Sequence, residues 1–258
     1  KVLAQLKPLL KPTAVITDVG STKQAVLTAA EEVFGELPPK FILGHPIAGA
    51  EKSGVQAAKA DLFNQHKTLL CPQTASNKNT SCPEALALVS ALWQAAGAEV
   101  ICMSISEHDQ VLARTSHLPH LLAFSLVETL ANKDERLDIF RYAAGGFRDF
   151  TRVAASDPIM WRDIFLANKT ACLDALDEFT QGLEQLKHLI ETDNSAALVA
   201  SFSRAKSARD YFTALLNQTA YQTMQNQELT LQTTSGTGAL VGSLRVPGDK
   251  SISHRAIM

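Results

Sequence analysis

The chain has 258 residues, of which 46% are hydrophobic and 19% charged, which predicts a packed core rather than a disordered chain. Its formal net charge of −2 argues against nucleic acid or an anionic membrane surface as a partner, and no apolar run reaches the roughly 20 residues of a membrane span. The four cysteines have no C-x-x-C spacing, which predicts reduced thiols in a cytoplasmic protein.

Strand and helix patterns alternate over the first hundred residues. The apolar runs predict strands at 14–18, 41–43, 68–71 and 100–103, with one helix ending near Gly35 and another over 83–96. This alternation is typical of a parallel sheet covered by helices on both faces. Ser21 could cap the first helix, with Gln24 completing a capping box. Ligands of such sheets bind beyond the carboxyl ends of strands, where Ser21 and His45 fall.

After Ser106 the pattern becomes helical. We predict a long helix over 107–132, kinked at Pro119 because proline cannot donate the helical hydrogen bond. Asp157 and Pro158 read as the N-cap and first-turn proline of a second helix that reaches about Ile190. A third helix is predicted from Ser195 to about 217. The apolar stripe of the second helix favours packing against another copy of the chain, and therefore a homodimer.

The composition changes again near the end of the chain. Residues 225–242 are rich in Gln, Thr, Ser and Gly and read as a linker, after which a new pattern begins. We therefore predict an α/β domain over 1–105, a helical domain over 106–224, the linker over 225–242, and the start of a further domain over 243–258.

Four motifs in order carry a resemblance to a known family. They are residues 18–23 (DVGSTK), 44–54 (GHPIAGAEKSG), 116–120 (SHLPH) and 145–163 (GGFRDFTRVAASDPIMWRD). Over residues 1 to about 220 the chain resembles the prephenate dehydrogenase family, also called cyclohexadienyl or arogenate dehydrogenases. The resemblance implies a Rossmann-like dinucleotide-binding domain, an all-α dimerisation domain, and NAD or NADP as cofactor. It also implies oxidative decarboxylation of prephenate or arogenate in tyrosine biosynthesis.

The resemblance assigns roles to individual residues. His45 resembles the catalytic histidine that accepts a hydrogen bond from the ring hydroxyl, a role that suits a near-neutral imidazole pKa. Ser21 resembles the serine that links this histidine, the hydroxyl and the nicotinamide, although a plain helix N-cap is the alternative. Gly20, Ser21 and Lys23 are implied to bind the cofactor.

Arg152 resembles the arginine that holds a substrate carboxylate, a task that suits the fixed fork of a guanidinium. A surface ion pair is the alternative for Arg152, and Arg148 could share its role. Gly145 and Gly146 could let the backbone approach the substrate ring. The other residues that the resemblance assigns to the substrate site are His117, His120, Trp161 and Glu51.

Each of these assignments has a simpler alternative. Glu51 is linked to gating in the family, but could be a solvated loop charge. Trp161 could be an aromatic wall of the site or a core residue. His117 and His120 lie one helical turn apart, and with the pair His108-Asp109 nearby they could suggest a metal. H-x-x-H without a well-placed third ligand is weak evidence, so we predict no metal.

The chain departs from the family in one respect. It contains no G-x-G-x-x-G turn, which holds the pyrophosphate in such folds, and no residue that would choose NAD or NADP. We expect that turn to lie upstream of Lys1, and the 258 residues alone to bind dinucleotide poorly and to be inactive. The tail from Arg245 resembles the opening of 5-enolpyruvylshikimate-3-phosphate synthase, with Lys250, Ser251 and Arg255 at its phosphate- and shikimate-contacting positions. A parent chain of this kind would be bifunctional.

Two other functions remain open at this stage. One is a different hydroxyacid dehydrogenase with a helical dimer domain, although such enzymes usually place a lysine on the helix for proton transfer and the His45-Pro46 sequence argues against it. The other is a non-catalytic dimerisation module, which the helical half alone could support.

Overall fold

The structure, a computed structural model, describes residues 2–49, 59, 61–73, 80–132 and 140–225. The chain divides into two compact units, Lys1–His188 and Leu189–Met258. Glu51, together with Lys250, Ser251 and Arg255, lies outside the described residues. The sheet and the candidate site described below belong to the first unit.

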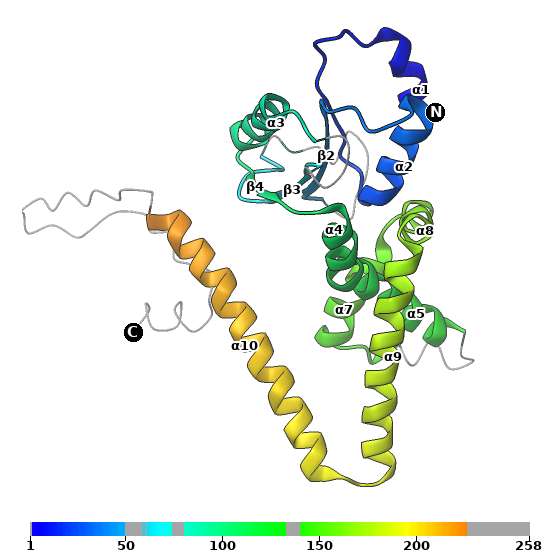
Figure 1. Cartoon of the computed structure of the whole chain (residues 1–258). Coiled ribbons are helices and arrows are strands. Elements are labelled where there is room, and N and C mark those ends of the chain that lie inside the picture. Colours follow the sequence, from blue (N-terminus) through cyan, green and yellow to red (C-terminus); the bar gives the residue numbers. More distant parts are fainter. Residues whose placement is uncertain (1, 50–58, 60, 74–79, 133–139, 226–258) are drawn as a thin grey trace, which may run out of the picture. The chain divides into compact units, whose positions relative to one another are not determined.

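A four-stranded sheet forms the centre of the first part of the chain, in the order β1 (Ile16–Thr17), β2 (Phe41–Ile47), β3 (Lys67–Cys71) and β4 (Glu99–Cys102) (Figure 1). All four predicted strands are present. The prediction of a wholly parallel sheet was wrong, because β2 and β3 are antiparallel while the two outer pairs are parallel. Antiparallel strands do not need a crossover helix between them.

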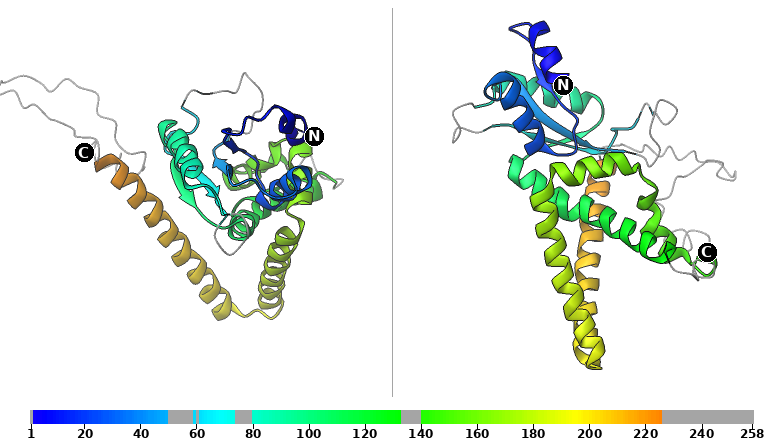
Figure 2. Two further views of the ribbon diagram at one scale, coloured as in Figure 1. Left: turned by 45° about the horizontal axis from the view of Figure 1, so that its top comes forward. Right: turned by 90° about the vertical axis from the view of Figure 1, so that its right-hand side faces the viewer.

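Helices cover both faces of this sheet, α2 (Lys23–Phe34) on one and α3 (Pro83–Ala95) on the other (Figures 1 and 2). Because successive side chains of a strand point to opposite faces, β2 contributes to both layers. Phe41 and Leu43 pack in the cluster that includes Ala30 of α2. Ile42 packs in the other cluster, with Val89 of α3. All three β2 side chains are at most 1% exposed, which anchors the strand that carries His45.

The two helices end as the sequence predicts. Gly35 closes α2 with a left-handed φ of +90°, the conformation that favours glycine at this position. Pro83 begins α3, and Gly97 follows its end with φ +85°. A Cβ at Gly97 would lie 2.8 Å from the side-chain oxygen of Asn64, so a larger residue would have to displace the loop before β3.

The predicted helix over 107–132 is divided into three pieces. These are α4 (Ile105–Leu112), the π-helical turn η3 (Ala113–His117) and α5 (Leu118–Ala131). The interruption lies close to Pro119, as a wide turn that precedes the proline. In that turn the N–H of Leu118 donates to the carbonyl of Ala113, five residues earlier. The wider turn accommodates a proline that could not continue a regular ladder.

Later in the first unit, the described residues also form α7 (Gly145–Thr151), the 3₁₀ turn η4 (Arg152–Ala155), α8 (Pro158–Ala167) and most of α9 (Lys169–Glu191). The predicted cap is confirmed, since the Asp157 carboxylate accepts the N–H groups of Ile159 and Met160 at 2.8 and 2.9 Å. The predicted continuous helix from 158 to about 190 was wrong. It is broken at Asn168, whose side chain is used elsewhere.

The second unit contains the end of α9 and the single long helix α10 (Ser195–Gln225), which extends the third predicted helix. Several large apolar side chains of α10 are exposed, among them Val199, Phe202, Tyr211 and Phe212.

None of the helices in the described part of the chain combines the length and apolar character needed to cross a membrane. The chain begins with the short helix α1 (Val2–Leu6) and the 3₁₀ turn η1 (Lys7–Leu9).

Candidate active site

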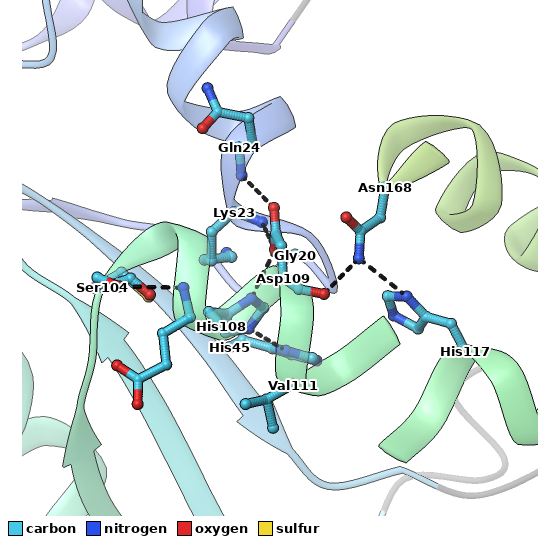
Figure 3. Close-up of polar contacts among 12 residues, drawn as sticks. Gly20, Lys23, Gln24, His45, Ser104, His108, Asp109, Val111, His117 and Asn168 are labelled. Carbon is cyan, nitrogen blue, oxygen red and sulfur yellow. Dashed lines mark hydrogen bonds and ion pairs between the residues drawn. The ribbon is translucent and has the colours of Figure 1, made fainter. Parts of the chain in front are cut away.

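His45 is the first member of a chain of three polar side chains (Figure 3). Its Nδ1 lies 2.9 Å from Nε2 of His108, and Nδ1 of His108 lies 2.7 Å from an oxygen of Asp109. His45 is not in a loop beyond its strand, as the sequence suggested, but within β2, where it pairs with Leu69 of β3. The apolar run predicted a strand over 41–43 only, whereas β2 continues to Ile47. His108 and Asp109 belong to α4, so this series of hydrogen-bonded side chains connects the sheet to the helical part.

The hydrogen bonds of Asp109 determine which group donates and which accepts in this series of three side chains. Burial alone would raise the pKa of Asp109, but hydrogen bonds from His108 and from two backbone N–H groups lower it, so the group is a carboxylate. A carboxylate only accepts, so Nδ1 of His108 carries the proton. With one proton on each ring, Nε2 of His108 accepts from Nδ1 of His45. The lone pair of His45 is then on Nε2, which can accept a hydrogen bond from a ligand.

The environment keeps His45 neutral. Burial, followed by the nearby His108, Lys23 and His117, lowers the pKa of His45 to about 3. This is well below the near-neutral pKa that the sequence analysis assumed. A neutral imidazole with such a low pKa binds a proton weakly at physiological pH, but it still accepts hydrogen bonds. His45 is therefore better suited to polarise a hydroxyl by accepting its hydrogen bond than to take up its proton completely.

Asp109 also caps the N-terminus of α2. Its two oxygens accept the backbone N–H groups of Lys23 at 2.8 Å and Gln24 at 2.9 Å (Figure 3). The capping box predicted from Ser21 and Gln24 was therefore wrong. The helix starts at Lys23 and its N-cap residue, Thr22, makes no side-chain cap. The positive end of the α2 dipole also favours a carboxylate at this place. Sequence pattern cannot find a cap that comes from so far along the chain.

Lys23 lies in the interior rather than on an open surface. Its side chain is completely buried, and its ammonium group contacts the Asp18 carboxylate and the carbonyl oxygen of Gly44, the latter at 2.5 Å. Asp18 also accepts the N–H groups of Gly20 and Gly44, at 2.8 and 2.9 Å. A Cβ at Gly44 would lie 2.9 Å from the backbone oxygen of Asp18, so this close approach of strands β1 and β2 requires glycine.

A second cluster contains three of the residues that the sequence assigns to the substrate. The ring of His120 stacks on Trp161 with a centroid distance of 3.8 Å, and His117 meets the same indole edge-on at 6.1 Å. His120 donates from Nδ1 to the carbonyl of Ser116 at 2.8 Å, so its Nε2 is an acceptor. The indole nitrogen of Trp161 is buried with no hydrogen-bond partner among the described residues. The cluster thus has a stacked aromatic wall and unused polar atoms.

Asn168 connects the two clusters. Its amide nitrogen donates to the backbone oxygen of Asp109 at 2.8 Å and faces Nδ1 of His117 at 3.3 Å (Figure 3). The thiol sulfur of Cys172 lies 3.5 Å from the same Nδ1 of His117. Burial lowers the pKa of His117 to about 4, so this histidine is also neutral. The sequence analysis missed Asn168 because its only signal is a polar residue inside an amphipathic helical stripe.

The other substrate residues lie on neighbouring elements. Arg152 opens η4, Gly145 and Arg148 belong to α7, and all three are exposed. Both elements pack against α5, the helix that carries His120. A Cβ at Gly145 would meet open space, so no close backbone contact within the chain requires glycine there.

The N-terminus of α2 is occupied by a carboxylate of the chain itself. Helix N-termini bind anions in many folds, but here the N–H groups of Lys23 and Gln24 donate to Asp109. The ammonium of Lys23 is turned inward, toward Asp18 and Gly44. Gly20 and the half-buried Ser21 remain at the turn that follows β1.

The cysteines and acidic residues do not form a metal centre in the described part of the chain. No group of three or more His, Cys, Asp or Glu side chains there is arranged to hold a metal ion. Cys71, Cys82, Cys102 and Cys172 are free thiols. Burial raises the pKa of Cys71 to about 12, so this thiol is not a nucleophile at neutral pH.

Comparison with known families gives two adjacent matches. Residues 1–102 match the nucleotide-binding domain of prephenate dehydrogenase, and residues 104–204 match its dimerization domain. A cyclohexadienyl dehydrogenase from Zymomonas mobilis is 38% identical over 211 residues, which are 81% of this chain and 69% of that protein. A prephenate dehydrogenase from Bacillus subtilis is 41% identical over 198 residues, 76% of this chain but only 51% of its own length.

A solved structure gives the same result. Prephenate dehydrogenase from Aquifex aeolicus, in complex with hydroxyphenyl propionate and NAD⁺, is 39% identical with a TM-score of 0.74, covering 82% of this chain and 71% of that one. These matches confirm the α/β domain followed by a helical domain, the oxidoreductase class and the nicotinamide cofactor that the motifs implied. From its two domains and its relatives, the chain belongs to the prephenate dehydrogenase family.

Proposed function

We propose that this chain forms the catalytic site of an NAD(P)-dependent oxidative decarboxylation, with prephenate as substrate and 4-hydroxyphenylpyruvate and carbon dioxide as products. Arogenate is the alternative substrate. The observation that carries the proposal is the hydrogen-bonded series from Asp109 through His108 to His45, which leaves an acceptor on Nε2 of His45. A hydroxyl on the substrate ring is the donor that this acceptor suits.

The proposed chemistry uses that acceptor during hydride loss. Hydride leaves the ring carbon that bears the hydroxyl, and NAD(P)⁺ supplies the hydride acceptor when it is bound. As hydride leaves, the hydroxyl proton becomes more acidic, so its hydrogen bond to Nε2 of His45 strengthens. Loss of the ring carboxylate as carbon dioxide then makes the ring aromatic. The buried Asp109 stabilises any positive charge that develops on the two imidazoles.

The other proposed roles concern substrate binding. Arg152 holds a substrate carboxylate, and His117, His120, Trp161, Gly145 and Glu51 contribute to the same site. What supports this set is the packing of η4 and α7 on α5, together with the stacked pair of His120 and Trp161. Ser21 lies at the turn after β1 and is not used as the helix cap, which favours a role toward the nicotinamide.

One assay tests the proposed function. The natural full-length protein is supplied with prephenate or arogenate, each with NAD⁺ or NADP⁺, and formation of reduced cofactor is followed. Turnover of prephenate that depends on His45 supports the proposal. Turnover of a simple hydroxyacid, with none of either cyclohexadienyl substrate, would replace it with a different dehydrogenase. Turnover of none of them, in a protein that still dimerises, would favour a dimerisation module.

We also infer a homodimer in the cytoplasm, built on the helical domain. The dimerization-domain match covers 104–204, and exposed apolar residues such as Leu173, Leu183 and Phe202 occur along α9 and α10. Light scattering after size exclusion should give twice the chain mass. A monomer at micromolar concentration would contradict this inference. The division at residues 105, 224 and 242 remains a prediction, which limited proteolysis can test.

The segment from Arg245 supports a second, separate proposal. Its sequence resembles the start of 5-enolpyruvylshikimate-3-phosphate synthase, with Lys250, Ser251 and Arg255 at the matching positions. We propose that the natural full-length protein also transfers enolpyruvate to shikimate 3-phosphate. Phosphate release from phosphoenolpyruvate in the presence of shikimate 3-phosphate tests this activity. Its absence from the natural protein would remove the proposal.

A further inference from the structure

We propose that Lys23 is a positioning residue that holds His45 and the Ser21 turn together, rather than a residue that contacts the cofactor. The proposal rests on the proposed function, because it concerns the residues that would act in that reaction. Lys23 lies next to the candidate active site, and its side chain has no exposed surface. The proposed reaction gives no reason for a buried lysine at this position.

A buried ammonium group is unfavourable unless it is paired. Lys23 has two partners, and both belong to backbone segments that lead into the site. The Asp18 carboxylate precedes the Gly20–Ser21 turn and binds the N–H of Gly20. The carbonyl oxygen of Gly44, which lies 2.5 Å from the ammonium, belongs to the residue before His45. The ammonium therefore joins the end of β1 to the part of β2 that carries the imidazole.

Lys23 reaches His45 by a second route through its backbone. The N–H of Lys23 donates to Asp109 at 2.8 Å, Asp109 accepts from His108, and His108 meets Nδ1 of His45 at 2.9 Å. The two routes close a ring of contacts that begins and ends at Lys23, and Figure 3 shows the second route. One route fixes the backbone of His45 and the other fixes the proton on its ring. Changing the side chain opens the ring without removing any group of the relay.

The positive charge of Lys23 also affects the protonation of His45. The charged and titratable groups that act on His45 are His108, Lys23, His117 and Asp109. Lys23 is one of the groups that lower the pKa of His45, whereas Asp109 raises it. Loss of the ammonium should therefore raise the pKa of His45 and weaken the preference for a proton on Nδ1.

The first test uses nuclear magnetic resonance of the 258-residue chain without ligand. Imidazole nitrogen shifts report which nitrogen of His45 carries the proton, with His45→Asn used for assignment. We expect the wild type to carry it on Nδ1, and Lys23→Met to show a mixture of tautomers and a higher pKa. Lys7→Met is the matched control, because Lys7 bonds the carbonyl of Val33 at 2.6 Å on an exposed part of the chain. A wild-type His45 spectrum in Lys23→Met would overturn the proposal.

Lys23→Met leaves the partly buried Asp18 carboxylate without its cation, so this variant can fail to fold. The double variant Lys23→Met with Asp18→Asn removes both charges and keeps the shapes similar. We expect the double variant to fold, by circular dichroism, and still to show mixed His45 tautomers. A folded double variant with the wild-type tautomer would also overturn the proposal.

The second test separates positioning from cofactor contact in the natural full-length enzyme. We expect Lys23→Met to lower kcat on the order of tenfold, while the KM for the cofactor changes less than about twofold. A raised cofactor KM with unchanged kcat would show that Lys23 contacts the cofactor. The spectroscopic arm needs no turnover. If the wild-type enzyme does not use prephenate, the proposed function fails, while the His45 spectra still decide the role of Lys23.

Discussion

The lone pair on Nε2 of His45 depends on a carboxylate two side chains away. Asp109 requires a proton on His108, and His108 then requires one on Nδ1 of His45. The motif around residue 45 identified the first member of this series. The sequence also showed His108 and Asp109 side by side, but suggested only a metal site for them, which we did not predict. Only the fold brings residue 108 to residue 45, so spacing along the chain could not reveal the pairing.

Replacing His45 by Asn tests its role at the level of chemistry. We expect kcat in the natural enzyme to fall by about 100- to 10,000-fold, the usual range for a lost proton-transfer or hydrogen-bonding partner. The KM for substrate should change much less, because the lost interaction strengthens only as hydride leaves. Steady-state kinetics give both constants. An unchanged kcat would remove His45 from the mechanism.

Replacing Arg152 by Gln tests substrate binding. A carboxylate held equally before and during the reaction contributes uniform binding, so we expect a higher substrate KM with a smaller effect on kcat. The loss of one partner of a buried pair is worth on the order of 2–5 kcal/mol, and the exposure of Arg152 in the structure without ligand favours the lower end. Arg148→Gln is the matched control on the neighbouring helix. If Arg148→Gln alone raises KM, Arg148 holds the carboxylate.

Among the elements, α2 shows how a distant residue can determine where a helix begins. Local pattern found its end at Gly35, because a glycine that follows a helical stripe is a local signal. The same reasoning failed at its start, where the cap comes from α4. It failed in a similar way for the direction of β2 and β3, which depends on pairing between strands. A feature that depends on neighbouring residues, such as the glycine at the end of α2, can be predicted from the sequence. Contacts between residues far apart in the sequence cannot be predicted in this way.

The cap on α2 predicts a stability effect. Asp109→Ala leaves two helix N–H groups and buried His108 without their acceptor. We expect the free energy of unfolding to fall by about 2–4 kcal/mol, combining a lost N-cap of about 1 kcal/mol with one or two unsatisfied buried groups. Urea denaturation of the 258-residue chain measures it. Asp157→Ala is the matched control, since it removes the exposed cap of α8 and should lower stability by only about 1 kcal/mol.

For the whole molecule, His45 and His117 predict a pH dependence of stability. The pKa of His45 is lowered to about 3 and that of His117 to about 4, whereas both are near 6.5 in an unfolded chain. Below pH 6.5 the unfolded chain therefore binds more protons than the folded one. Stability should be complete above about pH 6.5 and fall as the pH drops toward 4.

Urea midpoints between pH 4 and 8 measure this dependence. His45→Asn should be less sensitive to acid than the wild type over the same range. His66→Gln, at an exposed position before β3, is the control and should keep the wild-type slope. Equal slopes for all three proteins would mean that His45 does not contribute to the acid sensitivity.

The fold class of the molecule could be read from its sequence because α/β alternation and helical periodicity are repeated many times along the chain. The candidate site could be read only in part. His45, His117, His120 and Trp161 fall in motifs, while Asn168 joins their two clusters without any motif of its own. A residue that connects two groups is defined by its neighbours in space, so a single sequence contains no signal for it.

The π-helical turn at Ala113–His117 makes the position of a deletion in this segment as important as its length. A π turn holds about one residue more than an α-helical turn, so deletion of the exposed Thr115 would allow a regular helix to form there. Every residue after the deletion would then keep about its present rotation around the helix axis relative to α4, because the turn loses only the residue that made it wide. His120 would stay on the face that stacks on Trp161. Loss of a single codon at this surface position could thus be tolerated in evolution, whereas loss of one residue from the regular turns of α4 would rotate every later residue by about 100° and remove His120 from that face.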